Sequence, residues 1–378
     1  NLTRITFPFL FFISLASFFS AILNSHNKFG VAAATPIILN VLLIACLLYA
    51  DYLEDSLVYY LSYTVSIAGL TQLIFIFFFV KKYYIPKLEL NFTIDSKVRL
   101  FFKKLLPSIF SSGVTQINIL IGTIIASFQA SAVSYLYYAD RIYQINLAIA
   151  GIAIGTVILP NLSRYIKSKN KTRIIVLQNK ALELSLFLSL PASLALIFGS
   201  EEITSSLFGY GSFDKTSVGN SAKALFYFSL GLPAFSFIKI FSSFLFARND
   251  TSTPFKLSVI SVLINILISV TFFNKVGFII IPIATTISSW VNGLMLMIIV
   301  INKKYFEFNI VFWNKIPRII LSNFIMVLAF YFILNNFDYL FTYENTYKFL
   351  NVILLVLFSF FLYIAVSIFT KAFKIDDI

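Results

Sequence analysis

Long apolar runs recur along the whole chain, and they constrain its fold more than any other feature. A helix needs about 20 residues to cross the hydrocarbon core of a bilayer, which is about 30 Å thick. Eleven runs approach or exceed this length, and each is predicted to be a membrane-spanning helix. They cover residues 5–24, 31–50, 57–80, 105–128, 142–162, 182–199, 222–246, 255–273, 277–301, 318–335 and 349–370.

The runs favour helices over a transmembrane barrel. Barrel strands alternate apolar and polar residues over about 10 positions, whereas these runs are continuously apolar. Only 12% of the residues are charged, well below the roughly one quarter found in soluble domains. The predicted fold class is therefore an all-α integral membrane protein, a polytopic helical bundle.

Enzymatic and metal-binding signatures are absent from the sequence. It contains no P-loop and no HExxH motif, and its single histidine, His26, lies in a predicted loop. The single cysteine, Cys46, lies inside the second run, which excludes an internal disulfide and a thiolate metal cluster. We therefore predict no cofactor and a carrier rather than an enzyme.

The net charge of +13 has two interpretations, nucleic-acid binding or membrane topology. One set of alternate loops holds 22 of the 29 Lys and Arg residues, the other set holds 5, and Arg141 and Lys239 lie within spans. Because basic loops stay in the cytoplasm, this asymmetry predicts topology and argues against nucleic acid. The protein is therefore expected to be a multi-pass membrane protein with its C-terminus in the cytoplasm.

An internal repeat is predicted from a shift of 225 residues. The shift aligns Pro8 with Pro233 and Asn24 with Asn249, and near the end of the third helix of each set it becomes 222. The two sets are separated by an even number of helices, so they share one orientation, as in transporters with parallel repeats. The repeat also predicts that about three helices precede residue 1.

The repeat and the basic connectors divide the chain into four predicted parts. Residues 1–81 form a partial N-terminal lobe, and 82–104 form a basic cytoplasmic linker that lies at the lipid headgroups or in solvent. Residues 105–302 form a lobe of six helices, and 303–378 a C-terminal helix pair and tail. Residues 163–181 and 302–317 are expected to be further basic connectors.

Charged residues within spans are functional candidates, because a charge in hydrocarbon is costly. Asp140 and Arg141 are placed at the entrance to the fifth helix and Lys239 in the seventh. The alternative is structural: Asp140 pairs with Arg141 or a neighbour, or both reach the outer headgroups. Lys239 lies nine residues before Arg248, about 13 Å along a helix, which favours a cavity-lining position.

Uncharged polar residues in the same helices are secondary candidates. Ser134, Gln144 and Asn118 are grouped with the charged residues as predicted substrate-binding positions. Each could instead hold helices together by hydrogen bonds, which is the usual role of such residues in membranes.

Several strings resemble the bacterial MurJ/MviN lipid II flippases of the multidrug/oligosaccharidyl-lipid/polysaccharide exporter superfamily. They are LTRITFPFLFFISLASFFSAILNSHNKF (2–29), SYLYYADRIYQ (134–144), GIAIGTVILPNLSRY (151–165) and ARNDTSTPFK (247–256). The resemblance implies fourteen helices in the complete fold, arranged as two six-helix lobes around a cavity plus a final pair. Eleven helices here agree with the three expected before residue 1.

The resemblance also implies a function and a site. The substrate would be lipid II, an undecaprenyl-pyrophosphate-linked peptidoglycan precursor, moved by alternating access, with membrane lipids and cell-wall synthesis proteins as expected partners. Arg141 matches a cationic cavity position, with Ser134 and Asp140 beside it, while Gln144 stands where relatives often carry an acid. The alternatives are a flippase for another polyprenyl-linked glycan, a drug or cation exporter of the same superfamily, and a membrane scaffold.

Overall fold

The computed structural model describes residues 2–26, 28–49, 57–85, 96, 98–99, 116–147 and 153–373, and these residues form helices and turns with no strand. The chain divides into two compact units, Asn1–Asp95 and Ser96–Ile378. The all-α fold class predicted from the sequence is confirmed.

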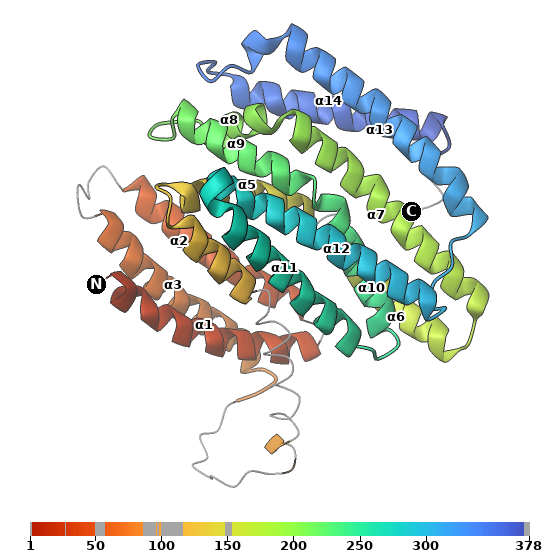
Figure 1. Ribbon diagram of the computed structural model, residues 1–378. Helices are drawn as coiled ribbons and strands as arrows, with labels where there is room; N and C mark the ends of the chain where they lie inside the picture. Colours follow the sequence, from red (N-terminus) through yellow and green to blue (C-terminus); the bar gives the residue numbers. More distant parts are fainter. Residues whose placement is uncertain are drawn as a thin grey trace. The chain divides into compact units, whose positions relative to one another are not determined.

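The first unit contains α1 (Leu2–Ser25), α2 (Phe29–Leu48) and α3 (Leu57–Val80) (Figure 1). Helix α3 packs against both α1 and α2. The side chains buried between α1 and α3 are Ala16, Phe19, Leu23, Ile76 and Val80. Since all three helices are apolar around most of their circumference, helix contacts alone bury only a small share of each.

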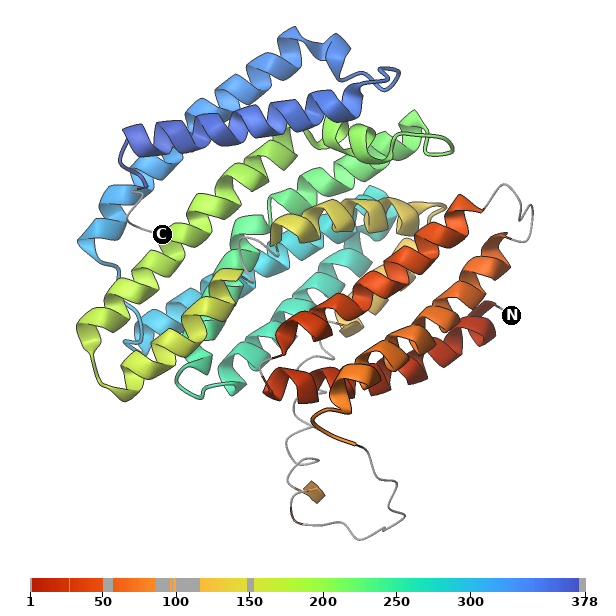
Figure 2. The ribbon, with the colours of Figure 1, turned by 180° about the vertical axis from the view of Figure 1, so that it is seen from behind.

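The described residues of the second unit include a short apolar helix, Gln116–Ala126, followed by twelve further helices, two of them 3-10 helices. These are α5 (Ala132–Leu147), α6 (Ala153–Lys167), α7 (Lys171–Phe198), α8 (Ser200–Phe208), α9 (Lys215–Ser229), α10 (Leu232–Phe246), α11 (Ser252–Val276), η4 (Gly277–Ile279), α12 (Ile280–Asn302), α13 (Ile310–Asn336), η5 (Asp338–Leu340) and α14 (Lys348–Phe369). Figure 2 shows α13 and α14 lying side by side along this unit, next to α7.

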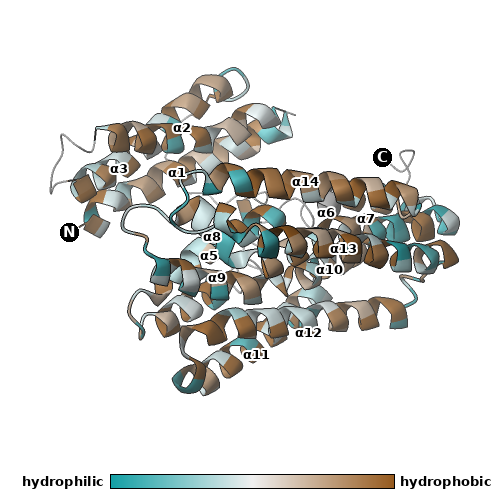
Figure 3. Ribbon diagram, turned by 90° about the horizontal axis from the view of Figure 1, so that it is seen from above, coloured by the Kyte–Doolittle hydropathy of each residue, from teal (hydrophilic) through white to brown (hydrophobic). Residues whose placement is uncertain are grey.

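Seven helices in the described part of the chain are long and apolar enough to cross a membrane, and α9 with α10 forms an eighth, bent span. Figure 3 shows hydrophobic residues along most of α11, α12 and α14. Many large apolar side chains are exposed on these helices, and Phe369 is 89% exposed. Such a surface is stable only against lipid, so the chain is a multi-pass membrane protein.

Three predicted boundaries were wrong. The single span predicted at 142–162 contains the end of α5 and most of α6, and α5 begins ten residues earlier, which places Asp140 and Arg141 inside it. The connectors predicted at 163–181 and 302–317 are largely helical, since only 168–170 and 303–309 separate the helices. These helices continue past their apolar runs because basic residues are compatible with a helix outside the hydrocarbon. Most of the predicted linker 82–104 lies outside the described residues.

Contacts within each unit support the predicted repeat. As α3 packs against α1 and α2, so α12 packs against α10 and α11. Ser66 of α3 donates a hydrogen bond to the Ile5 carbonyl of α1, and Trp290 of α12 donates one to the Leu230 carbonyl. Ile5 and Leu230 are separated by the predicted 225 residues, and Ser66 and Trp290 by 224.

The backbones of packed helices also approach closely at corresponding positions, where α3 crosses α1 and where α12 crosses α10. A Cβ atom added at Gly69 would lie 3.3 Å from Cβ of Phe12, and one added at Gly293 would lie 3.5 Å from Cβ of Phe237. The glycines are again 224 residues apart and the phenylalanines 225. The fit is tighter at Gly69, where the added atom would lie 2.8 Å from the Phe9 ring, than at Gly293, where it would lie 3.3 Å from the Ala234 carbonyl oxygen.

Side chains from other helices donate hydrogen bonds to the backbone carbonyls at the break between α9 and α10. The two helices meet at an angle of 41°. The break frees backbone carbonyls, which cannot remain unpaired in hydrocarbon. Three of these carbonyls accept side-chain hydrogen bonds: Tyr227 from Thr286 (2.6 Å), Ser229 from Ser193 (2.6 Å) and Leu230 from Trp290 (3.0 Å).

We expect Thr286→Val to lower the free energy of unfolding by about 0.5–2 kcal/mol, because it removes the hydrogen-bond donor to Tyr227 without changing side-chain size. Thermal unfolding in detergent measures the effect. Thr123→Val is the matched control, since the Thr123 hydroxyl bonds only to Ile119 in its own helix. Equal melting temperatures for the two variants would contradict the structural role of Thr286.

A buried lysine fastens the α13–α14 pair to the end of α8. Lys348 is 3% exposed, and its Nζ donates to the carbonyls of Gly209 (2.6 Å) and Tyr343 (2.7 Å). The rings of Tyr210 and Tyr343 lie 4.4 and 4.2 Å from the same ammonium group. Two carbonyls and two ring faces compensate the loss of water around the charge.

We expect Lys348→Met to lower the free energy of unfolding by about 3 kcal/mol, because two buried carbonyls lose a charged donor. Lys215→Met is the control. Lys215 forms an ion pair with Glu344 beside this contact, but both side chains are more than 60% exposed, so the loss should stay below about 1 kcal/mol. Chemical unfolding of both variants checks the ranking, and a reversed order would refute it.

Candidate substrate-binding site

Helix α5 has two chemically distinct faces. Ala132, Ala139, Ile142 and Tyr143 are buried against the rest of the second unit. Six positions on the other side of the helix are exposed, and they include the apolar residues Val133 and Ile145. The remaining four, spaced by three and four residues, are Ser134, Tyr137, Arg141 and Gln144, hereafter the α5 polar face.

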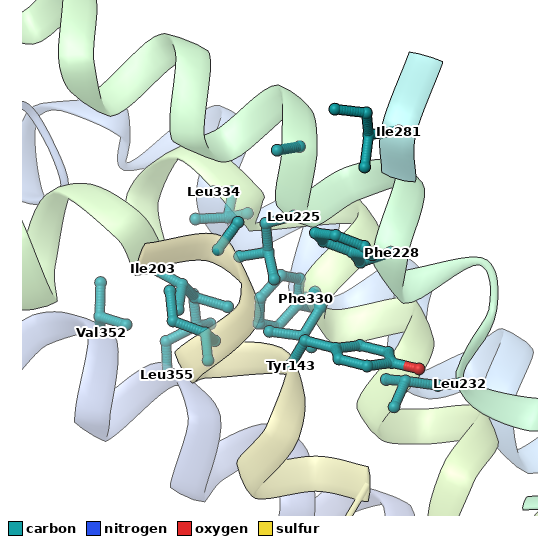
Figure 4. Close-up of a cluster of buried hydrophobic side chains, with 14 of the residues drawn as sticks. Tyr143, Ile203, Leu225, Phe228, Leu232, Ile281, Phe330, Leu334, Val352 and Leu355 are labelled. Atoms are coloured by element: carbon teal, nitrogen blue, oxygen red, sulfur yellow. The ribbon is translucent and has the colours of Figure 1, made fainter. Parts of the chain in front are cut away.

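The buried face is anchored by Tyr143. Its ring lies 5.5 Å from those of Phe228 and Phe235, between α9 and α10. Figure 4 shows Tyr143 beside Phe228 and Leu232 in the largest apolar cluster. These contacts fix the rotation of α5 about its axis, and that rotation presents the α5 polar face away from the packed core of the unit.

Arg141 lies over an aromatic ring and is not part of an ion pair. Its guanidinium carbon is 4.5 Å from the centre of the Tyr137 ring, one turn earlier on α5. Within the described residues no carboxylate approaches the guanidinium to within 4.0 Å. A guanidinium stacked on a ring keeps its N–H edge available for an anion.

Asp140 is held by Gln144, which donates a hydrogen bond from Nε2 to Oδ2 of Asp140 one turn earlier. The Asp140 side chain is only partly exposed. The predicted alternative, a salt bridge between Asp140 and Arg141, is therefore not formed. Adjacent side chains on a helix point in different directions, so Asp140 turns toward Gln144 and Arg141 toward Tyr137.

Lys239 is exposed on α10, as expected for a residue that lines a cavity or faces lipid. It lies one turn after Phe235, the residue that contacts Tyr143 on α5. Lys239 and Arg141 thus belong to two packed helices. No direct contact between their side chains is found among the described residues.

The two remaining candidates, Ser134 and Asn118, lie on different helices. Ser134 lies on the α5 polar face, one turn before Tyr137. Asn118 belongs to the helix Gln116–Ala126, and its Oδ1 is buried with no hydrogen-bond partner in the part of the chain that the structure describes. The structure thus groups Ser134, Arg141 and Gln144 on one face, with Asp140 beside them.

Tyr137 is the component that sequence reasoning missed. Its spacing of four residues before Arg141 is the signal that would have indicated a ring beneath the guanidinium.

The described residues contain no group of three or more His, Cys, Asp or Glu side chains that could hold a metal ion.

Comparison with known proteins identifies the family. Residues 1–373 match the family model described as Lipid II flippase MurJ. The chain is 39% identical over 336 residues to a probable lipid II flippase MurJ of Rhizobium meliloti, and 38% identical over 292 residues to that of Rickettsia prowazekii. These alignments cover 86% and 77% of this chain but 62% and 57% of the relatives, so the chain spans less than two thirds of their length.

Solved structures agree with the fold. An inward closed conformation of the lipid II flippase MurJ superposes with a TM-score of 0.79 and 27% identity, covering 98% of this chain and 74% of that one. An inward-facing multidrug resistance MATE transporter gives a TM-score of 0.69 over 80% of this chain and 70% of that one, at 14% identity, which shows a shared fold alone. On the family match, the identities to curated relatives and the superposition, this chain belongs to the lipid II flippase MurJ family.

Proposed function

We propose that this chain is part of a flippase that moves lipid II, the undecaprenyl-pyrophosphate-linked peptidoglycan precursor, across the bacterial inner membrane. The observation that carries the proposal is Arg141, an exposed guanidinium stacked on Tyr137 in a chain of the MurJ family. A flippase needs a site that attracts an anionic headgroup without binding it permanently, and one arginine on an otherwise uncharged face meets that need.

The chemistry of pyrophosphate suits this arrangement. Guanidinium presents N–H donors in a fixed fork that matches two phosphate oxygens at once. Tyr137 restricts the side chain to one plane, so less entropy is lost when the anion binds. Lys239, on the helix packed against α5, would add a second positive charge. Gln144 would support the site indirectly, because it holds the Asp140 carboxylate one turn along the helix.

Translocation by alternating access follows from this assignment. The headgroup would occupy a polar site in the protein while the polyprenyl chain stays in lipid, and the two lobes would rock about the site. A negative-inside potential favours outward movement of an anion by about 2.3 kcal/mol per charge per 100 mV. The driving force therefore need not come from a nucleotide.

The topology that we propose places the basic turns 168–170, 247–251 and 303–309, together with the C-terminus, in the cytoplasm. The positive-inside rule supports this orientation. The segments 199–214 and 337–347 would then face outward. Cell-wall synthesis proteins remain candidate partners for the cytoplasmic and outer loops.

We expect Arg141→Ala to abolish rescue of a flippase-depleted bacterium by the full-length gene and Arg141→Lys to rescue weakly, because lysine keeps the charge but loses the fork. Growth and cell lysis after depletion are the measurements. Lys256→Ala is the matched control, since Lys256 is an exposed cation at the start of α11, away from α5. Full rescue by Arg141→Ala, at equal protein levels, would eliminate the proposed site.

We also expect opposite accessibility for cysteines placed at two exposed positions, one in the first turn of α9 next to the segment 199–214 and one in the turn 168–170, once Cys46 is replaced by serine. A membrane-impermeant maleimide added to intact spheroplasts should label Thr216→Cys and should label Ser168→Cys only after lysis. Both positions are exposed, so burial does not confound the comparison. The reverse pattern would invert the proposed topology.

A further inference from the structure

An aromatic recess opens beside α5 at the end of α8. It has a volume of about 490 Å³ and is lined by Tyr138, Leu207, Phe208, Tyr210, Ser212 and Phe213. That volume falls within the range of small-molecule sites. Four of the six residues are aromatic, and the lining contains no charged side chain.

Arg141 and Tyr137 do not line the recess, but a series of ring contacts leads from them to Tyr138, which does. The guanidinium of Arg141 lies over Tyr137, whose ring centre is 6.0 Å from that of Tyr138. Tyr138 in turn lies 4.7 Å from Phe208 and 4.8 Å from Phe213. This aromatic track thus runs from a cation on the α5 polar face into the recess, with each step short enough for direct ring contact.

The chemistry of the lining indicates which part of a ligand it fits. An anion would gain little from uncharged rings, and the nearest buried cation, Lys348, is already satisfied by two carbonyls and two ring faces. Ring faces carry negative potential and attract weakly positive C–H groups. A pyranose offers such C–H faces together with hydroxyls that could pair with the Ser212 hydroxyl at the edge of the rings.

We infer that this track binds the sugar portion of the lipid-linked substrate while its pyrophosphate is held at Arg141. The inference rests on the proposed function. The sugar is joined directly to the phosphate, so it must lie within a few ångströms of the guanidinium, and Tyr137 and Tyr138 begin the track one turn away. A polyprenyl chain does not fit this role, because it remains in the surrounding lipid.

The test compares two lipids in nanodiscs, undecaprenyl pyrophosphate and the same lipid carrying its disaccharide. We expect Tyr138→Leu and Phe213→Leu to weaken binding of the glycosylated lipid about tenfold, the equivalent of ~1.4 kcal/mol, and to leave binding of the sugar-free lipid unchanged. Tyr138→Phe is the matched control, which keeps the ring and should bind both lipids like the wild type. Arg141→Ala should weaken binding of both lipids.

The outcomes separate the two proposals. Equal loss for both lipids in the leucine variants, or no loss for either, would overturn the sugar site and would leave the role of Arg141 intact. A loss in Tyr138→Phe as large as in Tyr138→Leu would also overturn it, since the ring would not be the binding element. If Arg141→Ala binds the sugar-free lipid like the wild type, the proposed function fails instead.

Discussion

Satisfying backbone polar groups without water is the constraint on which this structure depends. A continuous helix meets it internally, but the break between α9 and α10 does not, and the carbonyls freed there accept bonds from α7 and α12. The buried charge of Lys348 is satisfied in the same way, because carbonyls and ring faces surround its ammonium group in place of water. Polar side chains also join uninterrupted helices, as where Asn265 of α11 donates hydrogen bonds to Thr285 and Ser288 of α12.

The position of the candidate site follows from packing on the opposite face of one helix. Tyr143 fills the space between Phe228 and Phe235, so α5 cannot rotate without exposing a buried ring. Arg141 is thereby directed away from the core, with Tyr137 as its nearest neighbour. A hydrophobic contact, not an ionic one, decides where the positive charge is presented.

Apolar runs of about 20 residues could be recognised from the sequence, because they depend on composition and length. The repeat was predicted from spacing and stays a prediction. The break at Leu230 and Gly231 was not predictable, since the interrupted run remains apolar throughout. The start of α5 at Ala132 was not predictable either, because Ser134, the tyrosines and the adjacent Asp140 and Arg141 interrupt the apolar run. Asp140, Arg141 and Gln144 were candidates from the sequence, and the spacing of Tyr137 could have added the ring, but which face of α5 is buried depends on packing against Phe228 and Phe235.

The hydrogen bonds at the break between α9 and α10 affect how these helices can move. Straightening α9 and α10 would break the hydrogen bonds that Ser193 of α7 and Thr286 and Trp290 of α12 donate at the bend. The angle between α9 and α10 is therefore linked to their contacts with both neighbours, and a change in one requires a change in the other.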